Sequence, residues 1–198
     1  MLDCKMVAQL ARWFASTVQP LAATWLKSQI SSIHNVASYY CRSRIGDFSK
    51  RLSEHAKANA IDISGFTTST GATIAVGQSW GPTLRGLLAT PVPKVVITSP
   101  AALPGATATV RTPPTDPGLQ AAQGGKGSAA IREARLAEAA KRGIVPPKPS
   151  TPEGIFLHAV HDTACNVFGT VLGPEANDDH NEHFHLDMAP RPSSSYCE

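Results

Sequence analysis

The stretch Ala60-Ile61-Asp62-Ile63-Ser64 decides how this chain is interpreted, because from Ile61 onward its side chains alternate between apolar and polar. Alternation over this length is typical of a β-strand that has one face in the core. Ile61 and Ile63 would then face the core, and Asp62 would face away from it. The sequence therefore predicts a strand that presents one carboxylate on its polar face.

A second alternating stretch, Phe184-His185-Leu186-Asp187-Met188, predicts another strand late in the sequence. His183 and His185 are two residues apart, so on a strand both imidazoles lie on one face, opposite Phe184. If the two strands are neighbours, Asp62 and His185 converge. His55 would reach the same place from the loop before Asp62.

Other patterns predict the rest of the fold. Ser150 and Glu153 form a capping box at a helix start, Pro20 suits the first turn of another helix, and Ser128 and Gly143 bound a third. The predicted helices cover residues 2–14, 20–30, 128–142 and 150–168, and the remaining strands cover residues 33–40, 72–80 and 95–97. This order of elements predicts an α+β domain with a small, mainly antiparallel sheet flanked by helices.

Residues 81–150 differ from the rest in composition, because they are rich in Pro, Ala, Gly and Thr and almost free of aromatic residues. The 198 residues suit one domain, so we interpret this region as a partly mobile insertion within a single domain that spans residues 1–198. A passive loop is the preferred interpretation, since long segments of this composition are often merely flexible. An active-site lid and a partner-docking arm are the alternatives.

Composition excludes several classes of function. The hydrophobic share of 42% is enough to fill a core, and the net charge is only +3. Lys and Arg form no stripe with interleaved aromatic residues, so we expect no binding of nucleic acid. No apolar run is long enough to span a bilayer, so we expect no transmembrane segment.

Four cysteines are dispersed along the chain, at Cys4, Cys41, Cys165 and Cys197. None forms a CxxC pair, which argues against zinc bound by cysteine. An even, dispersed set favours two disulfides and an oxidising compartment over four buried thiols. Three pairings are open, and we prefer Cys4–Cys41 with Cys165–Cys197. Residues 1–5 do not resemble a signal peptide, so this compartment would require that a leader has been removed.

The histidines and the aspartate of the two strands suit a catalytic zinc site. Such a site usually takes three protein ligands from His, Asp or Glu and leaves a fourth position for water. His183 and His185 alone are a modest signal. The upstream pair of His55 and Asp62 strengthens it, because the two patterns together supply a full ligand set.

Several motifs resemble those of known families. Ser53-x-His55-(x6)-Asp62 followed by His183-x-His185 resembles the zinc peptidases grouped with lysostaphin, the D-alanyl-D-alanine carboxypeptidases and the murein endopeptidase MepA. A fuller match, over nearly the whole chain outside residues 81–150, is to the extensin-like protein C-terminal domain. It rests on Ser38-Tyr39-Tyr40-Cys41-Arg42, Leu52-Ser53-Glu54-His55-Ala56, Asn59-Ala60-Ile61-Asp62-Ile63, Phe168-Gly169-Thr170-Val171-Leu172-Gly173-Pro174, His183-Phe184-His185-Leu186-Asp187 and Tyr196-Cys197-Glu198.

The resemblance implies that His55, Asp62 and His185 bind Zn²⁺. Zinc would lower the pKa of its bound water to about 7 and polarise the peptide carbonyl. His183 would act as the general base or stabilise the transition state, since a neutral imidazole suits near-neutral pH. Glu182 is the alternative base, but on a strand it would point away from His183.

Two further residues receive roles from the resemblance. Arg42 would stabilise the oxyanion, and His180, which completes an HxxHxH pattern, would lie at the substrate.

Asp187 would orient a ligand histidine or hydrogen-bond within the fold. His158 and His161, three residues apart on one predicted helix, are interpreted as surface residues in preference to a second metal site.

The resemblance implies hydrolysis of peptide crosslinks in bacterial peptidoglycan by a zinc-dependent D,D- or L,D-endopeptidase of the periplasm or cell envelope. A D-alanyl carboxypeptidase is the nearest alternative, and it would need a pocket for a free carboxylate. A non-catalytic cell-wall-binding or scaffold domain is the alternative from another class. The complete ligand set favours an enzyme over a scaffold.

Overall fold

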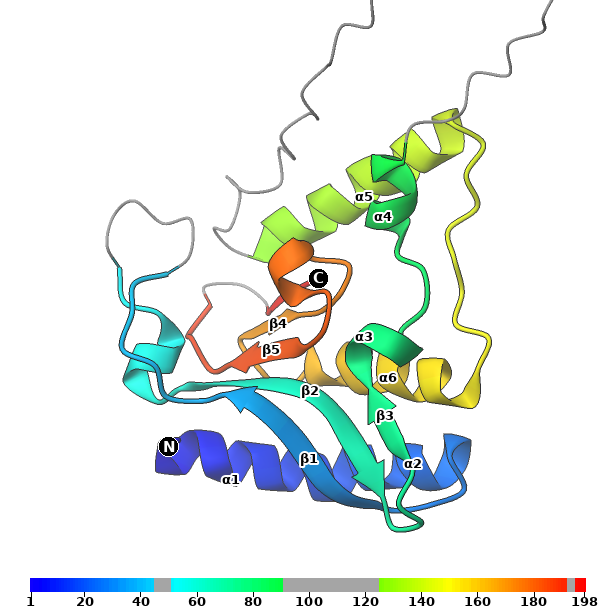
Figure 1. Cartoon of the computed structure of the whole chain (residues 1–198). Helices are drawn as coiled ribbons and strands as arrows, with labels where there is room; N and C mark the ends of the chain where they lie inside the picture. Colours follow the sequence, from blue (N-terminus) through cyan, green and yellow to red (C-terminus); the bar gives the residue numbers. More distant parts are fainter. Residues whose placement is uncertain (45–50, 91–124, 192–194) are drawn as a thin grey trace, which may run out of the picture.

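The computed structural model describes residues 1–44, 51–90, 125–191 and 195–198 (Figure 1). Much of the predicted insertion, including the predicted strand over residues 95–97, lies outside the described residues. Among the described residues, no helix has the length and the apolar character needed to cross a bilayer.

The described residues form one sheet and several helices, which confirms the predicted α+β class with a mainly antiparallel sheet. Its strands are β1 (Ile30–Ala37), β2 (Ala60–Thr68), β3 (Thr73–Ala75), β4 (Thr170–Leu172), β5 (Phe184–Asp187) and β6 (Tyr196–Cys197). Their order is β1-β2-β5-β4-β6, and β3 pairs with β2 beside this path. Only β4 and β6 run parallel. The two predicted alternating stretches, now β2 and β5, are therefore neighbours at the centre of the sheet.

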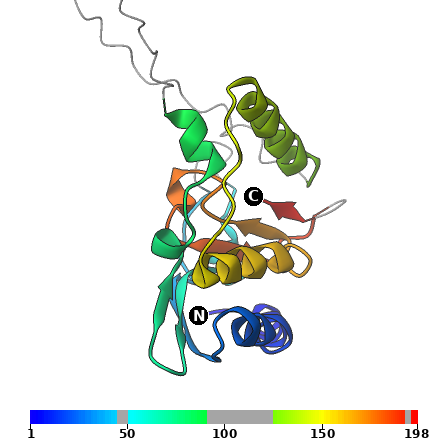
Figure 2. The same cartoon turned by 90° about the vertical axis from the view of Figure 1, so that its right-hand side faces the viewer.

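The core lies between the sheet and a layer of helices on one of its faces (Figures 1 and 2). This layer holds α1 (Cys4–Trp13), α2 (Gln19–Trp25) and α6 (Pro152–Ala164), and a π-helical turn (Phe14–Val18) joins α1 to α2. Phe66 of β2 meets Phe156 of α6 edge-on, with ring centroids 5.4 Å apart. Trp13 and Phe168 meet in the same way at 5.5 Å. Large buried rings therefore hold the helices against the sheet.

Several helix boundaries differ from the sequence predictions. Pro20 does stand in the first turn of α2. Thr151, not Ser150, caps α6, because its Oγ1 accepts from the N–H of Gly154 at 3.0 Å, and the helix ends at Ala164. The capping box was wrong because two adjacent hydroxyl residues compete for one cap and the backbone places Thr151 there.

The strand predicted over residues 72–80 was also wrong in its second half. β3 is short, and α3 (Val76–Ser79) follows it directly. Trp80 N donates to Val76 O at 3.0 Å, so the chain coils and turns the indole inward. The Trp80 ring stacks on His158 with centroids 3.6 Å apart and meets Phe184 edge-on. Tertiary packing of one large side chain thus overrides the local strand pattern.

The described parts of residues 81–150 contain two helices that lie side by side (Figure 1). They form α4 (Leu84–Ala89) and α5 (Gly125–Lys141), and Arg142 joins them by donating to Leu88 O and Thr90 O. The predicted helix end before Gly143 is confirmed, since that residue has a φ of 66°. The predicted start at Ser128 was wrong by three residues, because the helix begins at Gly125. The lid and partner-docking alternatives for this region stay predictions.

The cysteines follow the prediction only in part. A disulfide links Cys165, just after α6, to Cys197 of β6, as predicted. The predicted Cys4–Cys41 disulfide was wrong, since both of these thiols are free and exposed. Cys4 begins α1 and Cys41 lies in the loop after β1, and a count of cysteines does not indicate how their Cβ vectors are directed.

Candidate metal centre

The register of the central strands brings Asp62 and His185 together. β2 and β5 pair so that Asp62 lies directly opposite His185, and Ile61 lies opposite Leu186. Residues that are directly opposite in an antiparallel pair share a face, so the carboxylate and the imidazole project to the same side. Ile63, by contrast, is fully buried in the core. The predicted alternation of β2 is therefore what presents Asp62.

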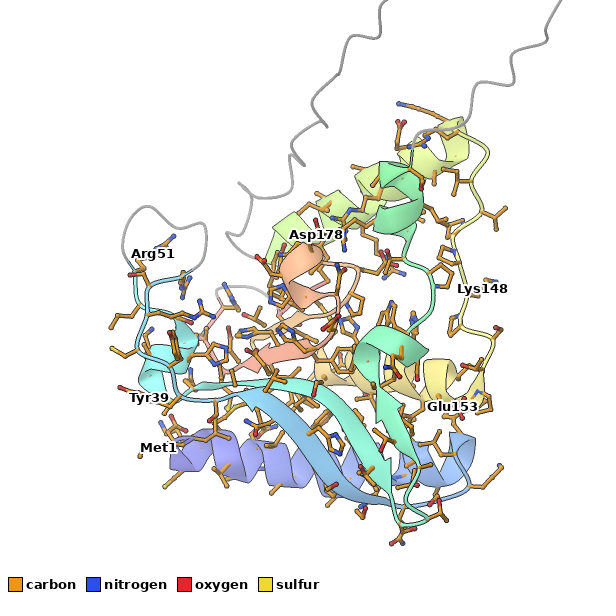
Figure 3. All side chains as sticks on the ribbon, viewed as in Figure 1. Met1, Tyr39, Arg51, Lys148, Glu153 and Asp178 are labelled. Carbon is orange, nitrogen blue, oxygen red and sulfur yellow. A yellow bond between two sulfur atoms is a disulfide. The ribbon has the colours of Figure 1, made fainter. Side chains whose placement is uncertain are left out.

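A short 3₁₀ turn (Glu54–Lys57) supplies the third member, His55. Ser53 caps this turn, because its Oγ accepts from His55 N at 3.3 Å. Ala58 then adopts a left-handed conformation, with a φ of 56°, which turns the chain into β2. Figure 3 shows side chains of this turn and of β5 meeting at the same end of the sheet.

His55, Asp62 and His185 form a group that we call the His–Asp–His cluster. Each contributes one ligand-type atom, and these three atoms lie close to one another. The distances are 3.1 Å from His55 Nε2 to His185 Nδ1, 2.9 Å from His185 Nδ1 to Asp62 Oδ1, and 3.2 Å from His55 Nε2 to Asp62 Oδ1. Ligand atoms about 2.0–2.1 Å from a tetrahedral zinc ion lie about 3.3 Å apart. The triangle therefore has the size that zinc requires after only a small expansion.

The outward nitrogens of both histidines are held by fixed acceptors. His55 Nδ1 lies 2.6 Å from the carbonyl oxygen of Ser38, and His185 Nε2 lies 3.2 Å from Asp187 Oδ2. A nitrogen that donates to such an acceptor keeps its own proton, so a metal ion would bind at the other nitrogen, in exchange for any proton which that nitrogen carries. In both rings that other nitrogen is the one that faces Asp62. Outer partners of this kind orient histidine for metal binding.

The charges in the cluster favour a cation. Burial raises the pKa of the Asp62 carboxyl, but hydrogen bonds from His185 and His55 outweigh it and hold this pKa well below its usual range. Burial lowers the pKa of His185, whereas its hydrogen bonds to Asp187 and Asp62 raise it, to about 9. Two carboxylates thus flank one imidazole with 13% side-chain exposure and favour a positive charge there, which a metal ion would also supply.

His183 and His180 stand next to the cluster. His183 Nε2 lies 3.8 Å from Asp62 Oδ1, and the ring centroid of His180 lies 5.2 Å from that of His183 and 6.0 Å from that of His185. Burial lowers the pKa of His183, and burial together with the charges of His185 and His183 lowers the pKa of His180 to about 3. Both imidazoles are therefore neutral near pH 7.

Glu182 lies outside the strand on which the sequence argument had placed it. β5 begins at Phe184, so Glu182 belongs to a turn and the strand argument does not apply to it. Its side chain is exposed, and its Cβ and Cγ lie beside Gly77 of α3. His183 is thus the residue of this pair that contacts the cluster.

Arg42 reaches the site through the backbone of its loop. Arg42 O accepts from Ser53 N at 3.0 Å, and Tyr40 N donates to His55 O at 3.3 Å, so this loop lies along the turn that holds His55. Arg42 lines a cleft of about 220 Å³ together with His55, His180 and His185. The structure therefore lines one cleft with four of the predicted site residues, and it places Asp62 against His185 and His183 against Asp62.

Some residues of the cleft were missed by the sequence reasoning. Glu54 is buried, and its carboxylate accepts from Lys57 at 2.8 Å and Asn59 at 2.7 Å. Arg191 also lines the cleft, four residues after Asp187. Glu54 stands in a predicted motif beside His55, which could have drawn attention to it. No pattern in the sequence marks Arg191.

A second group of ligand-type atoms lies elsewhere among the described residues. His161, Cys165 and Cys197, the His–Cys–Cys cluster, place such atoms within 4.8 Å of one another. The two cysteines form the disulfide, and His161 Nε2 lies 3.2 Å from Glu198 O. The surface placement predicted for His161 was wrong, because this residue is buried against Trp80 and Phe184.

The fold and the His–Asp–His cluster define a small α+β domain with a candidate metal centre on its central strands. The chain belongs to the family described as extensin-like protein C-terminus, whose family model matches residues 1–94 and 114–198. Searches of curated proteins and of solved structures gave no match.

Proposed function

We propose that this protein is a zinc-dependent peptidase that hydrolyses peptide crosslinks of bacterial peptidoglycan. The observation that carries the proposal is the triangle of His55 Nε2, Asp62 Oδ1 and His185 Nδ1, with sides of 2.9–3.2 Å and with outer partners on both histidines. Zinc held by three such ligands keeps a fourth position open and supplies a Lewis acid that makes water acidic near neutral pH.

His183 is the proposed general base. Its imidazole is neutral near pH 7, since burial lowers its pKa, and its Nε2 lies within 4 Å of the Asp62 carboxylate. A neutral nitrogen at this position can accept the proton that the attacking water gives up and pass it to the leaving amine. The exposed carboxylate of Glu182, which packs beside Gly77, is less well placed for this role.

Arg42 and His180 are proposed to act on the substrate. Both line the cleft beside His185. The Arg42 guanidinium offers donors to the oxygen that becomes negative when the amide is attacked. His180, kept neutral by its low pKa, can hydrogen-bond the substrate without adding a charge that would repel the metal.

The substrate class rests on the resemblance of the Ser53-x-His55-(x6)-Asp62 and His183-x-His185 motifs to zinc peptidases of the bacterial cell wall. The disulfide between Cys165 and Cys197 supports a place in the periplasm or cell envelope, where such bonds persist. The cut bond would be a D,D- or an L,D-crosslink.

A D-alanyl carboxypeptidase is the second candidate, because arginines line the cleft and suit a free carboxylate. A non-catalytic scaffold is disfavoured, since nothing in the described ligand set is missing.

The test is incubation of the zinc-loaded protein with purified crosslinked muropeptides, followed by chromatography with mass detection. Conversion of dimers to monomers, absent with the His183→Ala variant, is the expected result, and the product masses identify the bond. Release of terminal alanine alone would replace the endopeptidase with the carboxypeptidase. No cleavage of any muropeptide by a fully zinc-loaded protein would refute the proposed substrate class.

A further inference from the structure

Arg191 contacts Thr170, which lies next to Asp187, the residue that holds the outer nitrogen of His185. Its Nη2 donates to Thr170 Oγ1. Thr170 of β4 stands opposite Asp187 of β5 in the register, and Asp187 Oδ2 lies 3.2 Å from His185 Nε2. Arg191 and His185 line the same cleft. The guanidinium is therefore fixed near the reacting centre by the same strands that hold the ligands.

The Arg191 guanidinium has no carboxylate partner among the described residues. Its Nε is buried and makes no hydrogen bond with them. Two of the carboxylates that line the cleft are engaged elsewhere, Asp187 with His185 and Glu198 with Arg135 at 2.8 Å. A guanidinium is always charged and carries five N–H donors. Leaving such a cation partly buried without a counter-ion is costly, so the site is incomplete without an anion.

The geometry of the group indicates which anion fits. A planar guanidinium pairs with a carboxylate through two parallel N–H···O bonds. Two other arginines line the cleft. Arg44 already pairs with Glu54 at 3.2 Å, and Arg42 is the proposed partner of the oxyanion, which leaves Arg191 as the candidate for the free carboxylate.

We propose that Arg191 binds a free carboxylate of the peptide substrate, so that the cleft selects peptides that carry an acid close to the scissile amide. This proposal rests on the peptidase function and names the feature of the substrate that the site recognises. Arg191 is then a specificity residue, which acts on substrate binding and leaves the chemistry at the metal centre unchanged.

The test compares two probes that differ only in this charge. One is a crosslinked muropeptide dimer with free carboxylates, and the other is the same dimer with those groups converted to carboxamides. Binding to zinc-loaded His183→Ala protein is measured by calorimetry, so that hydrolysis does not interfere. We expect the acid to bind at least about tenfold more tightly, as for a charge-assisted hydrogen bond.

Arg191→Gln, made in the same background, is expected to remove this preference. Arg12→Gln is the matched control and is expected to keep it, because Arg12 is exposed on α1, away from the residues of the cleft, and its side chain hydrogen-bonds Gln9. Arg191→Lys retains the charge without the planar fork and is expected to keep only part of the preference. Turnover is measured with His183 retained. There, Arg191→Gln alone should raise KM for the acid and leave kcat nearly unchanged.

The outcomes separate this proposal from the proposed function. Equal binding of acid and amide by the Arg191-containing protein, or a preference that survives in Arg191→Gln, overturns the proposal even when dimers are cleaved. If neither dimer binds and neither is cleaved, both the proposed peptidase function and the proposed role of Arg191 are refuted. Zinc content and thermal unfolding of Arg191→Gln check its folding, and Arg191→Lys serves if that variant does not fold.

Discussion

Two clusters of ligand-type atoms in this protein differ in how their atoms are engaged. In the His–Asp–His cluster, each imidazole has one nitrogen held by an outer acceptor and the other directed at Asp62. In the His–Cys–Cys cluster, the sulfurs are bonded to each other, and the nitrogens of His161 lie 3.2 Å from Asp162 Oδ1 and from Glu198 O. Proximity is common to both clusters, but only in the first do ring nitrogens with a fixed direction face a carboxylate at which a metal ion can replace a proton.

The comparison teaches that a candidate metal centre needs ligand atoms that are available to bind an ion. Proximity of such atoms is not enough. The sulfurs of a disulfide are not thiolates and do not act as strong ligands for zinc. A carboxylate whose pKa is held low, between two imidazoles held in place by outer partners, is ionised and already positioned to bind a cation.

Removing a ligand from the first cluster is expected to have the largest effect. His185→Ala should weaken zinc binding roughly a thousandfold or more, because two remaining ligands do not form a catalytic site. Peptidase activity should fall to background. Zinc stoichiometry after dialysis, measured by elemental analysis, gives the result. His161→Ala is the matched variant in the second cluster, and a loss of zinc there as large as in His185→Ala would break the comparison.

Removing the proposed base separates chemistry from metal binding. His183→Ala should lower kcat by about 10²–10⁴-fold, the usual contribution of a general base. Zinc should stay bound, since His183 lies outside the triangle of ligand atoms. Steady-state hydrolysis of crosslinked muropeptides measures the change. Glu182→Gln should alter kcat little, and a greater loss in Glu182→Gln than in His183→Ala would reverse the two roles.

The second cluster is expected to stabilise the fold without binding metal. The disulfide closes a loop with a sequence separation of 32 residues, so Cys165→Ala with Cys197→Ala should cost about 3–4 kcal/mol in the free energy of unfolding. Urea denaturation under oxidising conditions measures this. Cys4→Ser with Cys41→Ser, at two exposed and free thiols, should change stability by less than about 0.5 kcal/mol. Equal losses in the free energy of unfolding in the two double variants would show that the Cys165–Cys197 disulfide does not stabilise the fold more than the free thiols do.

The outer partner of His185 is expected to have a smaller effect than the ligand itself. Asp187→Asn keeps the shape of the side chain and removes its charge, which should weaken zinc binding about 10- to 100-fold. Competition with a chelator of known affinity provides the measurement. An unchanged zinc affinity would mean that the contact between Asp187 and His185 does not orient the imidazole.

The smallest expected effect is on stability against pH in the zinc-free protein. His180 has a pKa of about 3 in the folded state, against about 6.5 when unfolded. The unfolded chain therefore binds more protons between these values, and stability falls as the pH is lowered from about 6.5 towards 3. Between pH 7.5 and 5.5, His180→Gln should lose roughly 1–2 kcal/mol less than the unmutated protein. Denaturant titrations at both pH values test this, and equal losses would contradict it.

Much of the candidate site could be predicted from the sequence because its members follow local periodicity. Alternation placed Asp62 and His185 on one face, and their strands proved to be neighbours in register. The outer acceptor Ser38 O could not be predicted in this way, since a backbone carbonyl carries no signal in the sequence. Arg191 was missed for a related reason, because only the paired strands bring it to Thr170.

The errors in the fold also have physical causes. The pattern that suggested a strand up to Trp80 reflects burial of one indole against Phe184, a contact more than 100 residues away in sequence. The Cys4–Cys41 pairing followed from an even count, and counting does not reveal the direction of a thiol. Local patterns predicted the central strands, whereas long-range packing decided the features that were missed.

The most direct test of the central claim is anomalous diffraction at the zinc edge from crystals grown with one equivalent of zinc. We predict a single strong peak about 2.0–2.2 Å from His55 Nε2, Asp62 Oδ1 and His185 Nδ1. The absence of a peak at this position, or a peak at His161 in its place, would contradict the account.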